Sequence, residues 1–198
     1  MVSALKIACA DDERDMRDFY ARLLPEMGYE VCGVAATGHE LVSLCDQQQP
    51  NLVITDIKMP DMDGIDAAAE ICRRCALPVI LVSAYHEKEL LERAREDCVM
   101  GYLVKPIEEA DLETAISVAM TRFEQFAAVK QEAAGLRQAL ADRKVIERAK
   151  GIIMKRARVS EEEAFKRLQR MSWNKNQKLA QVAETIILAE EAMAGQPS

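Results

Sequence analysis

The sequence lacks the long apolar segments of a membrane protein. None of its apolar runs approaches the roughly 20 residues that a membrane-spanning helix needs, and its first residues lack the apolar segment of a secretory signal. Hydrophobic residues nevertheless make up 49% of the 198 positions, so the chain can bury a sizeable core. We therefore expect a cytoplasmic protein without a membrane partner.

Cysteine is missing after position 98, and the six cysteines before that point are typical of reduced thiols. They lie between Cys9 and Cys98, several of them inside predicted strands or helices, which argues against a disulfide framework. Cys72 and Cys75 form a C-x-x-C pair, but no second pair or neighbouring histidine accompanies it. Packing at a helix end is therefore favoured over a zinc or redox site.

Proline is missing between Pro106 and Pro197, and the β-strand pattern disappears from Glu108 onward. Apolar residues then recur at spacings of four and three, with one skipped position, at Leu112, Ile116, Ala119, Phe123, Phe126, Val129, Ala133, Leu136 and Leu140. The spacing predicts one long helix with a coiled-coil-like seam, imperfect at Gly135 and at the skip. Because this stripe is longer than a small sheet can cover, we expect a homodimer. The alternative is a helix that packs along its own domain.

Charge is distributed unevenly along the chain, whose net charge is −7. Residues 1–142 hold 14 Lys and Arg against 26 Asp and Glu, a balance of −12. Residues 143–178 hold 12 against 4, a balance of +8, and residues 179–198 contribute −3. This division indicates two modules with different partners, and a polyanion suits the basic one.

The first hundred residues alternate strands and helices. Strands are predicted at Leu5–Ala10, Glu30–Ala35, Leu52–Thr55, Pro78–Ser83 and Tyr102–Val104, and helices at Arg14–Met27, His39–Gln48, Ile65–Arg74 and Glu87–Asp97. This alternation predicts an α/β fold with a doubly wound, five-stranded parallel sheet covered on both faces. Such sheets bind ligands at the carboxyl ends of their strands.

Charged residues stand at three of these strand ends. The first strand ends at Asp11 and Asp12, the third at Asp56 and the fifth at Lys105, while Ser83 ends the fourth. With strand order 2-1-3-4-5 the three carboxylates would converge, and clustered carboxylates suit Mg²⁺. A carboxylate nucleophile with a metal, a lysine and a hydroxyl makes a phosphoryl-transfer site.

Each of these residues also has a simpler interpretation. Asp12 could cap the following helix, Ser83 could be a strand-end hydroxyl, and Lys105 could lie in solvent. The combination at the right strand ends favours the functional interpretation.

The first 120 residues resemble the receiver domain of two-component response regulators. The matching pieces are ADDE (10–13), ITDIKMPDMDG (54–64), VSA (82–84) and GYLVKP (101–106). The resemblance implies a flavodoxin-like fold in which Asp56 accepts a phosphoryl group from a sensor histidine kinase.

The same resemblance assigns the other site residues. It implies that Asp11, Asp12 and Asp56 hold Mg²⁺, with the backbone carbonyl of Lys58 completing the site. It also implies that Ser83 and Lys105 contact the phosphoryl oxygens, and that Tyr102 is the aromatic switch residue that turns inward when Ser83 moves.

The basic segment is predicted to end in a compact three-helix unit. The long helix continues through Lys155, and the capping box Ser160–Glu163 opens a second helix that ends at Met171. A turn over Ser172–Lys175 follows, and Asn176 can cap a third helix, Lys178–Met193.

Residues 143–187 resemble the ANTAR domain of AmiR/NasR-type transcription antitermination regulators. The resemblance lies in Ala149-Lys150-Gly151, Ile153-Met154, Glu163-Ala164-Phe165, Leu168, Leu179 and Val182-Ala183. It implies a three-helix unit that binds hairpins in nascent leader transcripts and promotes antitermination. We therefore expect a receiver domain over 1–120, a coiled-coil linker helix over 121–141 and an ANTAR domain over 142–194.

Basic and amide side chains are the candidate RNA contacts. They are Arg143, Lys144, Arg148, Lys150, Lys155, Arg156, Arg158, Lys166, Arg167, Arg170, Asn174 and Lys175. Cations of this kind contact phosphates and make binding salt-dependent. Trp173 could stack on an unpaired loop base, or it could fill the core where the three helices meet.

Two other functions compete with RNA binding. The last two predicted helices could form a helix-turn-helix that binds DNA, but the helix after Lys178 holds no Lys or Arg, which suits the major groove poorly. Alternatively, the output could be protein contact alone. In each case we expect a regulator rather than an enzyme.

Overall fold

The structure, a computed structural model, describes residues 4–84 and 98–194. The helix predicted at Glu87–Asp97 lies outside these residues. The chain divides into two compact units, residues 1–127 and residues 128–198, and one long helix contributes to both. No helix within the described ranges is long and apolar enough to cross a membrane.

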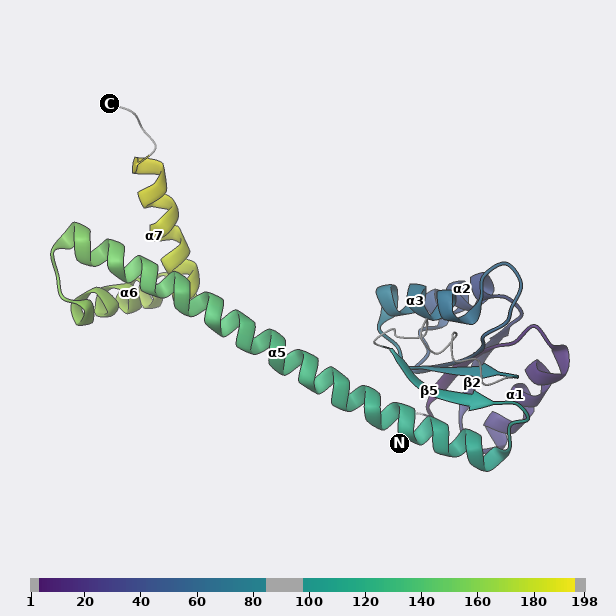
Figure 1. The fold of residues 1–198 in the computed structure, drawn as a ribbon. Helices are drawn as coiled ribbons and strands as arrows, with labels where there is room; N and C mark the ends of the chain where they lie inside the picture. Colours follow the sequence, from purple (N-terminus) through teal and green to yellow (C-terminus); the bar gives the residue numbers. More distant parts are fainter. Residues whose placement is uncertain (1–3, 85–97, 195–198) are drawn as a thin grey trace. The chain divides into compact units, whose positions relative to one another are not determined.

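The first unit is built on a sheet of five parallel strands (Figure 1). The strands are β1 (Lys6–Ala10), β2 (Glu30–Ala35), β3 (Leu52–Asp56), β4 (Val79–Ser83) and β5 (Val99–Val104). Their order, β2-β1-β3-β4-β5, confirms the predicted doubly wound fold. The central strands β1 and β3 are neighbours at the point where the order reverses, which is where such sheets bind ligands.

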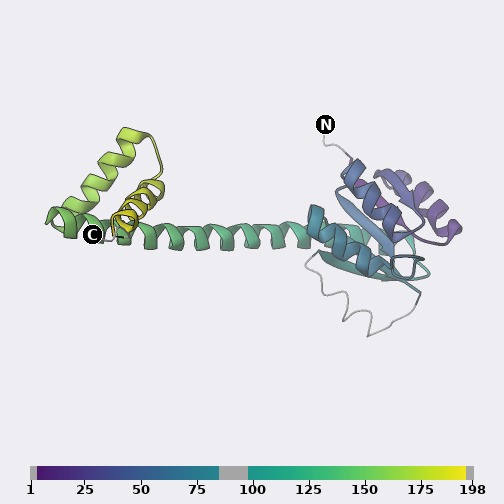
Figure 2. The ribbon, with the colours of Figure 1, turned by 90° about the horizontal axis from the view of Figure 1, so that it is seen from above.

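Helices cover both faces of this sheet (Figures 1 and 2). On one face lie α2 (Gly38–Gln48) and α3 (Gly64–Cys75), and on the other lie α1 (Arg14–Glu26) and the start of α5 (Glu109–Ala157). Alternate residues of a strand point to opposite faces, and Ile7 and Ala8 accordingly belong to different cores. Cys72 packs partly buried against the core at the end of α3, where the sequence predicts a packing role.

The helix α5 is a single helix of 49 residues whose apolar stripe has two environments. Leu112, Ile116 and Ala119 are buried in the core of the first unit. In the second unit Leu136 and Leu140 are each 61% exposed. The alternative of packing along its own domain therefore holds for the first part of the stripe, and only the later part is available for another chain.

The second unit packs the end of α5 against α6 (Glu161–Lys175) and α7 (Leu179–Ala194). Its core consists of Ala149, Leu168, Val182, Ala183 and Ile187. Ser160 accepts a hydrogen bond from the Glu163 N–H at the start of α6, which confirms the predicted helix start.

The predicted turn over Ser172–Lys175 is wrong, because α6 continues through Lys175. Asn176 adopts a left-handed conformation with φ of 50°, and its N–H bonds back to the carbonyls of Ser172 and Trp173. A left-handed asparagine commonly ends a helix in this way. Asn176 therefore ends α6 instead of capping α7.

Candidate functional site

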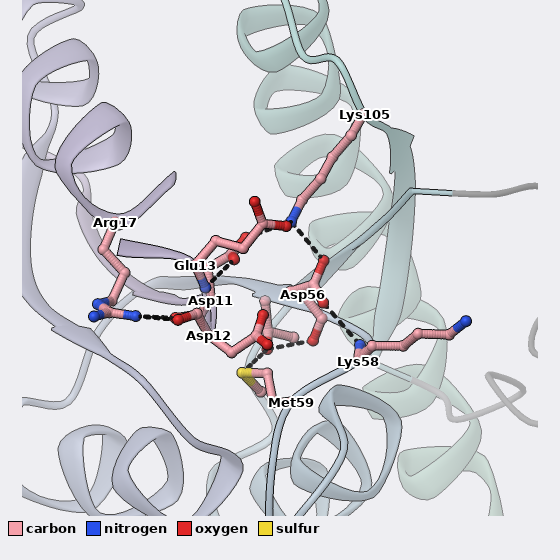
Figure 3. A network of polar contacts seen from close by, with 9 residues as sticks. Asp11, Asp12, Glu13, Arg17, Asp56, Lys58, Met59 and Lys105 are labelled. Carbon is pink, nitrogen blue, oxygen red and sulfur yellow. Dashed lines mark hydrogen bonds and ion pairs between the residues drawn. The ribbon is translucent and has the colours of Figure 1, made fainter. Parts of the chain in front are cut away.

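Two buried carboxylates meet at the carboxyl edge of the sheet. Asp11 directly follows β1 and Asp56 is the last residue of β3, and these two strands pair in parallel up to Ala10 and Thr55. Asp11 is fully buried and Asp56 is 5% exposed. The parallel register therefore brings together two acidic side chains that lie 45 positions apart in the sequence (Figure 3).

Lys105 bridges these carboxylates from the end of β5. Its Nζ lies 2.9 Å from Asp11 Oδ2 and 3.0 Å from Asp56 Oδ1. It also lies 3.3 Å from Glu13 Oε1. Figure 3 shows Lys105 among these acidic side chains. The simpler interpretation, a lysine in solvent, is therefore wrong.

Burial and pairing act on the charges of this cluster in opposite directions. Burial raises the pKa of both Asp11 and Asp56, and the hydrogen bonds from Lys105 offset part of that shift. Burial alone would lower the pKa of Lys105, but its hydrogen bonds to the two carboxylates outweigh burial and raise it. The site thus holds more negative charge than its single ammonium neutralises, which favours a further cation.

Asp11, Asp12 and Glu13 together form a possible cation site. Each offers a carboxylate oxygen, and these oxygens lie within 4.8 Å of one another. Only oxygen donors are present, which fits Mg²⁺. Glu13 was not among the residues predicted from the sequence, although it directly follows the two aspartates in the ADDE motif.

Backbone contacts fix the position of the Asp56 carboxylate. The N–H of Lys58 donates to Asp56 Oδ2 at 2.8 Å. The neighbouring helix α3 begins at Gly64, whose N–H donates to the carbonyl of Ile57 at 2.8 Å. A Cβ atom on Gly64 would overlap the carbonyl oxygen of Asp56, so only glycine fits this approach.

Arg17 holds the acidic loop from α1. Its Nη1 donates to the carbonyl oxygens of Asp11, at 2.8 Å, and of Asp12, at 2.7 Å (Figure 3). The side chain thereby binds the loop without neutralising a carboxylate directly. This role of Arg17 could not be predicted from the sequence, because its partners are backbone carbonyl groups, which every residue has.

Ser83 and Tyr102 lie on the neighbouring strands. Ser83 is buried at the end of β4, and its carbonyl accepts a hydrogen bond from the Lys105 N–H at 2.8 Å. Tyr102 of β5 is half-buried against the core covered by α2 and α3. The structure therefore places Ser83 beside the carboxylate cluster and Tyr102 on the adjacent strand.

Ion pairs occupy many of the candidate RNA-contacting cations in the second unit. Arg148 pairs with Glu191, Arg156 with Glu190, Lys166 with Glu162 and Arg167 with Glu163. These four pairs are exposed at the surface, where an ion pair stabilises a fold by roughly 0–1 kcal/mol. Such pairs therefore contribute little to the stability of the second unit.

Lys150 differs from these exposed cations. It is 8% exposed, and its Nζ lies 2.8 Å from Glu147 and 2.7 Å from Glu161. The hydrogen bonds that Lys150 donates to Glu147 and Glu161 raise the pKa of this lysine. Its ammonium also lies 5.8 Å from the centre of the Phe165 ring. Little of the side chain is left for a phosphate, and we infer that Lys150 holds α5 against α6.

The remaining candidate cations form no ion pair with any residue in ranges 4–84 and 98–194. They are Arg143, Lys144, Lys155, Arg158, Arg170 and Lys175, and all are exposed. Asn174 is exposed as well. Trp173 is 86% exposed, so the interpretation of this residue as part of the core is wrong.

Comparison with known proteins agrees with this division of the chain. Residues 7–117 match the response regulator receiver domain, and residues 134–187 match the ANTAR domain. The chain therefore belongs to the response regulators that join a receiver domain to an ANTAR domain.

Individual relatives agree with this family. The transcriptional regulatory protein PdtaR of Mycobacterium tuberculosis is 40% identical over 182 residues, which cover 92% of this chain and 89% of that protein. The receiver domain of a modulated diguanylate cyclase from Desulfovibrio desulfuricans superposes with a TM-score of 0.58 at 27% identity, over 62% of this chain and 98% of that one. A receiver domain from Clostridium thermocellum gives 0.56 at 29% identity, over 61% and 98%.

Proposed function

We propose that this response regulator is phosphorylated on Asp56 by a sensor histidine kinase and binds RNA hairpins in nascent leader transcripts through its second unit. Binding would stabilise an antiterminator at the expense of a terminator. The single observation that supports the phosphorylation step best is the bridge from Lys105 to Asp11 and Asp56.

The residues at the carboxyl edge have the chemistry that this step requires. A carboxylate oxygen of Asp56 attacks the phosphorus of a phosphohistidine. The P–O bond forms as the N–P bond breaks, and the electron pair leaves with the histidine nitrogen. Lys105 and Ser83 stand where they can bind the oxygens of the transferred group. Asp11, Asp12 and Asp56, with Glu13, would hold Mg²⁺, which supplies positive charge to the phosphoryl oxygens when bound.

The charge of the second unit supports RNA as the partner. The segment 143–178 has a balance of +8, whereas the rest of the chain is acidic. Helix α7, by contrast, holds no Lys or Arg and presents Glu184, Glu190 and Glu191. A recognition helix of this composition would be repelled by the major groove of DNA. RNA hairpins are therefore the better partner.

The exposed part of the α5 stripe supports a homodimer. Val129 is 65% exposed, and Leu136 and Leu140 are each 61% exposed. Their spacing places them on one side of the helix, where a second copy would cover them. Phosphorylation then acts by shifting an existing equilibrium between conformations.

A filter-binding experiment on the full-length protein tests the RNA-binding part of this proposal. Stem-loop RNA, a DNA duplex of the same sequence and a control without nucleic acid are compared, with and without Mg²⁺ and acetyl phosphate. We expect retention of the stem-loop at concentrations that leave the DNA free. Equal retention of both would favour the helix-turn-helix alternative, and retention of neither would leave protein contact as the output.

A further inference from the structure

One side of helix α6 carries an exposed aromatic ring together with cationic side chains. Lys166, Arg170 and Trp173 follow one another at spacings of four and three, which places them on one side of a helix. All three are exposed, whereas Ala164 and Leu168 are buried on the opposite side. We call Lys166, Arg170 and Trp173 the α6 face.

The ring of Trp173 leaves a large apolar surface in water. At 86% it is the most exposed large hydrophobic residue among those that the structure describes. Tryptophan is usually well covered in a folded protein, and its ring is a good platform for stacking. An unpaired nucleobase and the side chain of another protein are the two chemical classes that could cover it.

The charge around Trp173 favours the nucleobase. Arg170, Lys175 and Lys178 are exposed and form no ion pair with other residues of the described chain. Lys166 is held only by an exposed pair with Glu162, which is weak. Helix α7 begins at Leu179, directly after these cations, and has no acidic residue in its first turn. Its N-terminal end therefore adds to the attraction for phosphate.

A second copy of the chain fits this face poorly. In a two-fold symmetric contact each residue meets its own counterpart or a close neighbour of it. Arg170 of one copy would then approach the same cation of the other, and the acidic residue on this side of α6, Glu162, is already paired with Lys166. A polyanion with exposed bases would both neutralise the cations and cover the ring of Trp173.

We infer that Trp173 stacks on an unpaired base of the bound RNA while Arg170, on the same side of α6, contacts a flanking phosphate. This inference rests on the proposed RNA-binding function and deepens it, because it names the kind of base and the surface that receives it. A stacked ring tolerates every base, and loop accessibility rather than base identity would set its preference.

The chain provides its own probe for this contact, since Trp173 is its only tryptophan. Stem-loop RNAs with a randomised loop are first selected on the wild-type full-length protein and their affinity is measured by filter binding. The tryptophan emission is then followed as the selected RNA is added. We expect quenching that saturates with the same dissociation constant as filter binding. A continuous duplex of the same stem should quench little, because its bases are already stacked.

Three variants separate stacking from general effects of an exposed apolar side chain. Trp173→Leu should weaken binding of the selected stem-loop by about 5- to 150-fold, which corresponds to 1–3 kcal/mol for one stacked base, with little change for the duplex. Trp173→Phe keeps a ring and should recover most of the affinity. Leu188→Ala is the matched control, because Leu188 is exposed on α7 between Glu184 and Glu191 at the same spacings of four and three.

The possible results separate this inference from the function on which it rests. Stem-loop RNA that binds with unchanged emission, and binds Trp173→Leu as tightly as the wild type, would overturn the stacking contact and leave RNA binding intact. Tryptophan emission that changes with protein concentration in the absence of RNA would mean that a second copy of the chain covers the α6 face. That result would also overturn the stacking contact. A wild-type protein that retains no RNA would instead refute the proposed function.

Discussion

Among the residues that the structure describes, each unit of this response regulator has one lysine whose side chain is largely covered, and the two lysines have opposite surroundings. The side chains of Lys105 and Lys150 are 14% and 11% exposed. The partners of Lys105 are buried as well, since the Asp11 and Asp56 side chains are 0% and 7% exposed. The partners of Lys150 are open to water, at 55% for Glu147 and 66% for Glu161.

This difference explains why similar ion pairs serve different purposes. Burial raises the pKa of both carboxylates, so the cluster holds its negative charge unfavourably. Such a cluster is suited to accepting a cation or exchanging one partner for a phosphoryl group. The glutamates around Lys150 are hydrated and gain little from a new partner. Pairing there holds two helices together.

The largest effect is expected from Asp56→Asn, which should abolish phosphorylation. The amide oxygen is a poor nucleophile, and Asp56 combines the contact to Lys105 with a hydrogen bond from the Lys58 N–H. Intact-mass measurement after incubation with Mg²⁺ and acetyl phosphate detects the mass gain of an added phosphoryl group. Asp61→Asn is the matched control, because Asp61 lies in the same loop at φ of 68°, a conformation that asparagine tolerates. An undiminished mass gain in Asp56→Asn would refute the assignment.

The second-largest effect is expected on dimerisation, when charges are placed on the exposed apolar stripe of α5 in the second unit. Placing glutamate at both Leu136 and Leu140 should raise the dimer dissociation constant by about 100-fold or more, because each leucine covered in a contact contributes roughly 1.5–3 kcal/mol. Light scattering over a dilution series measures this constant. Gln131→Glu adds charge to the opposite side of α5 and should leave it unchanged. A wild-type protein that is monomeric throughout would contradict the dimer.

Replacement of Lys150 by methionine tests its role in packing. The variant should lower the opening free energy of α6 by about 1–2 kcal/mol, less than for a fully buried pair because the freed glutamates remain hydrated. Hydrogen exchange of peptides from α6 measures the opening. Lys144→Met, at an exposed cation of the same helix, should stay within about 0.5 kcal/mol. Comparable exchange in both variants would show that Lys150 does not hold the unit together.

The smallest effect distinguishes paired from unpaired cations on α5. Lys155→Gln should flatten the salt dependence of RNA binding by about one unit of slope if Lys155 contacts a phosphate. Arg156→Gln should change the slope less, because Arg156 already lies 2.8 Å from Glu190. Filter binding at several salt concentrations gives both slopes. Equal changes would mean that the ion pairs of the free protein do not predict its RNA contacts.

The sheet and the residues at its edge were predictable because both follow from local patterns. Alternating strands and helices determine the parallel order, and this order brings the carboxyl ends of β1 and β3 together. A reader of the sequence can therefore place Asp11 beside Asp56. Glu13 could also have been predicted from the sequence, because it belongs to the same ADDE motif as Asp11 and Asp12.

Contacts between helices were not predictable in the same way. The burial of Lys150 depends on Glu161, which lies on another helix, and no spacing rule relates the two. Arg17 binds carbonyl oxygens, which every residue has. The apolar stripe of α5 is continuous in sequence, yet Leu112 is buried in a core and Leu136 is exposed. Periodicity identifies the helix but does not identify what covers it.

The close approach of Gly64 to Asp56 has a consequence for genetics. A screen for loss of signalling would recover changes at both positions, and by phenotype alone the two would look like one functional class. Their causes differ, because Asp56→Asn removes the proposed nucleophile from an intact fold, whereas any side chain at position 64 forces α3 away from the strand end. Protein abundance in the mutant cells would separate them: the Asp56→Asn protein should accumulate normally, and Gly64 variants should be degraded.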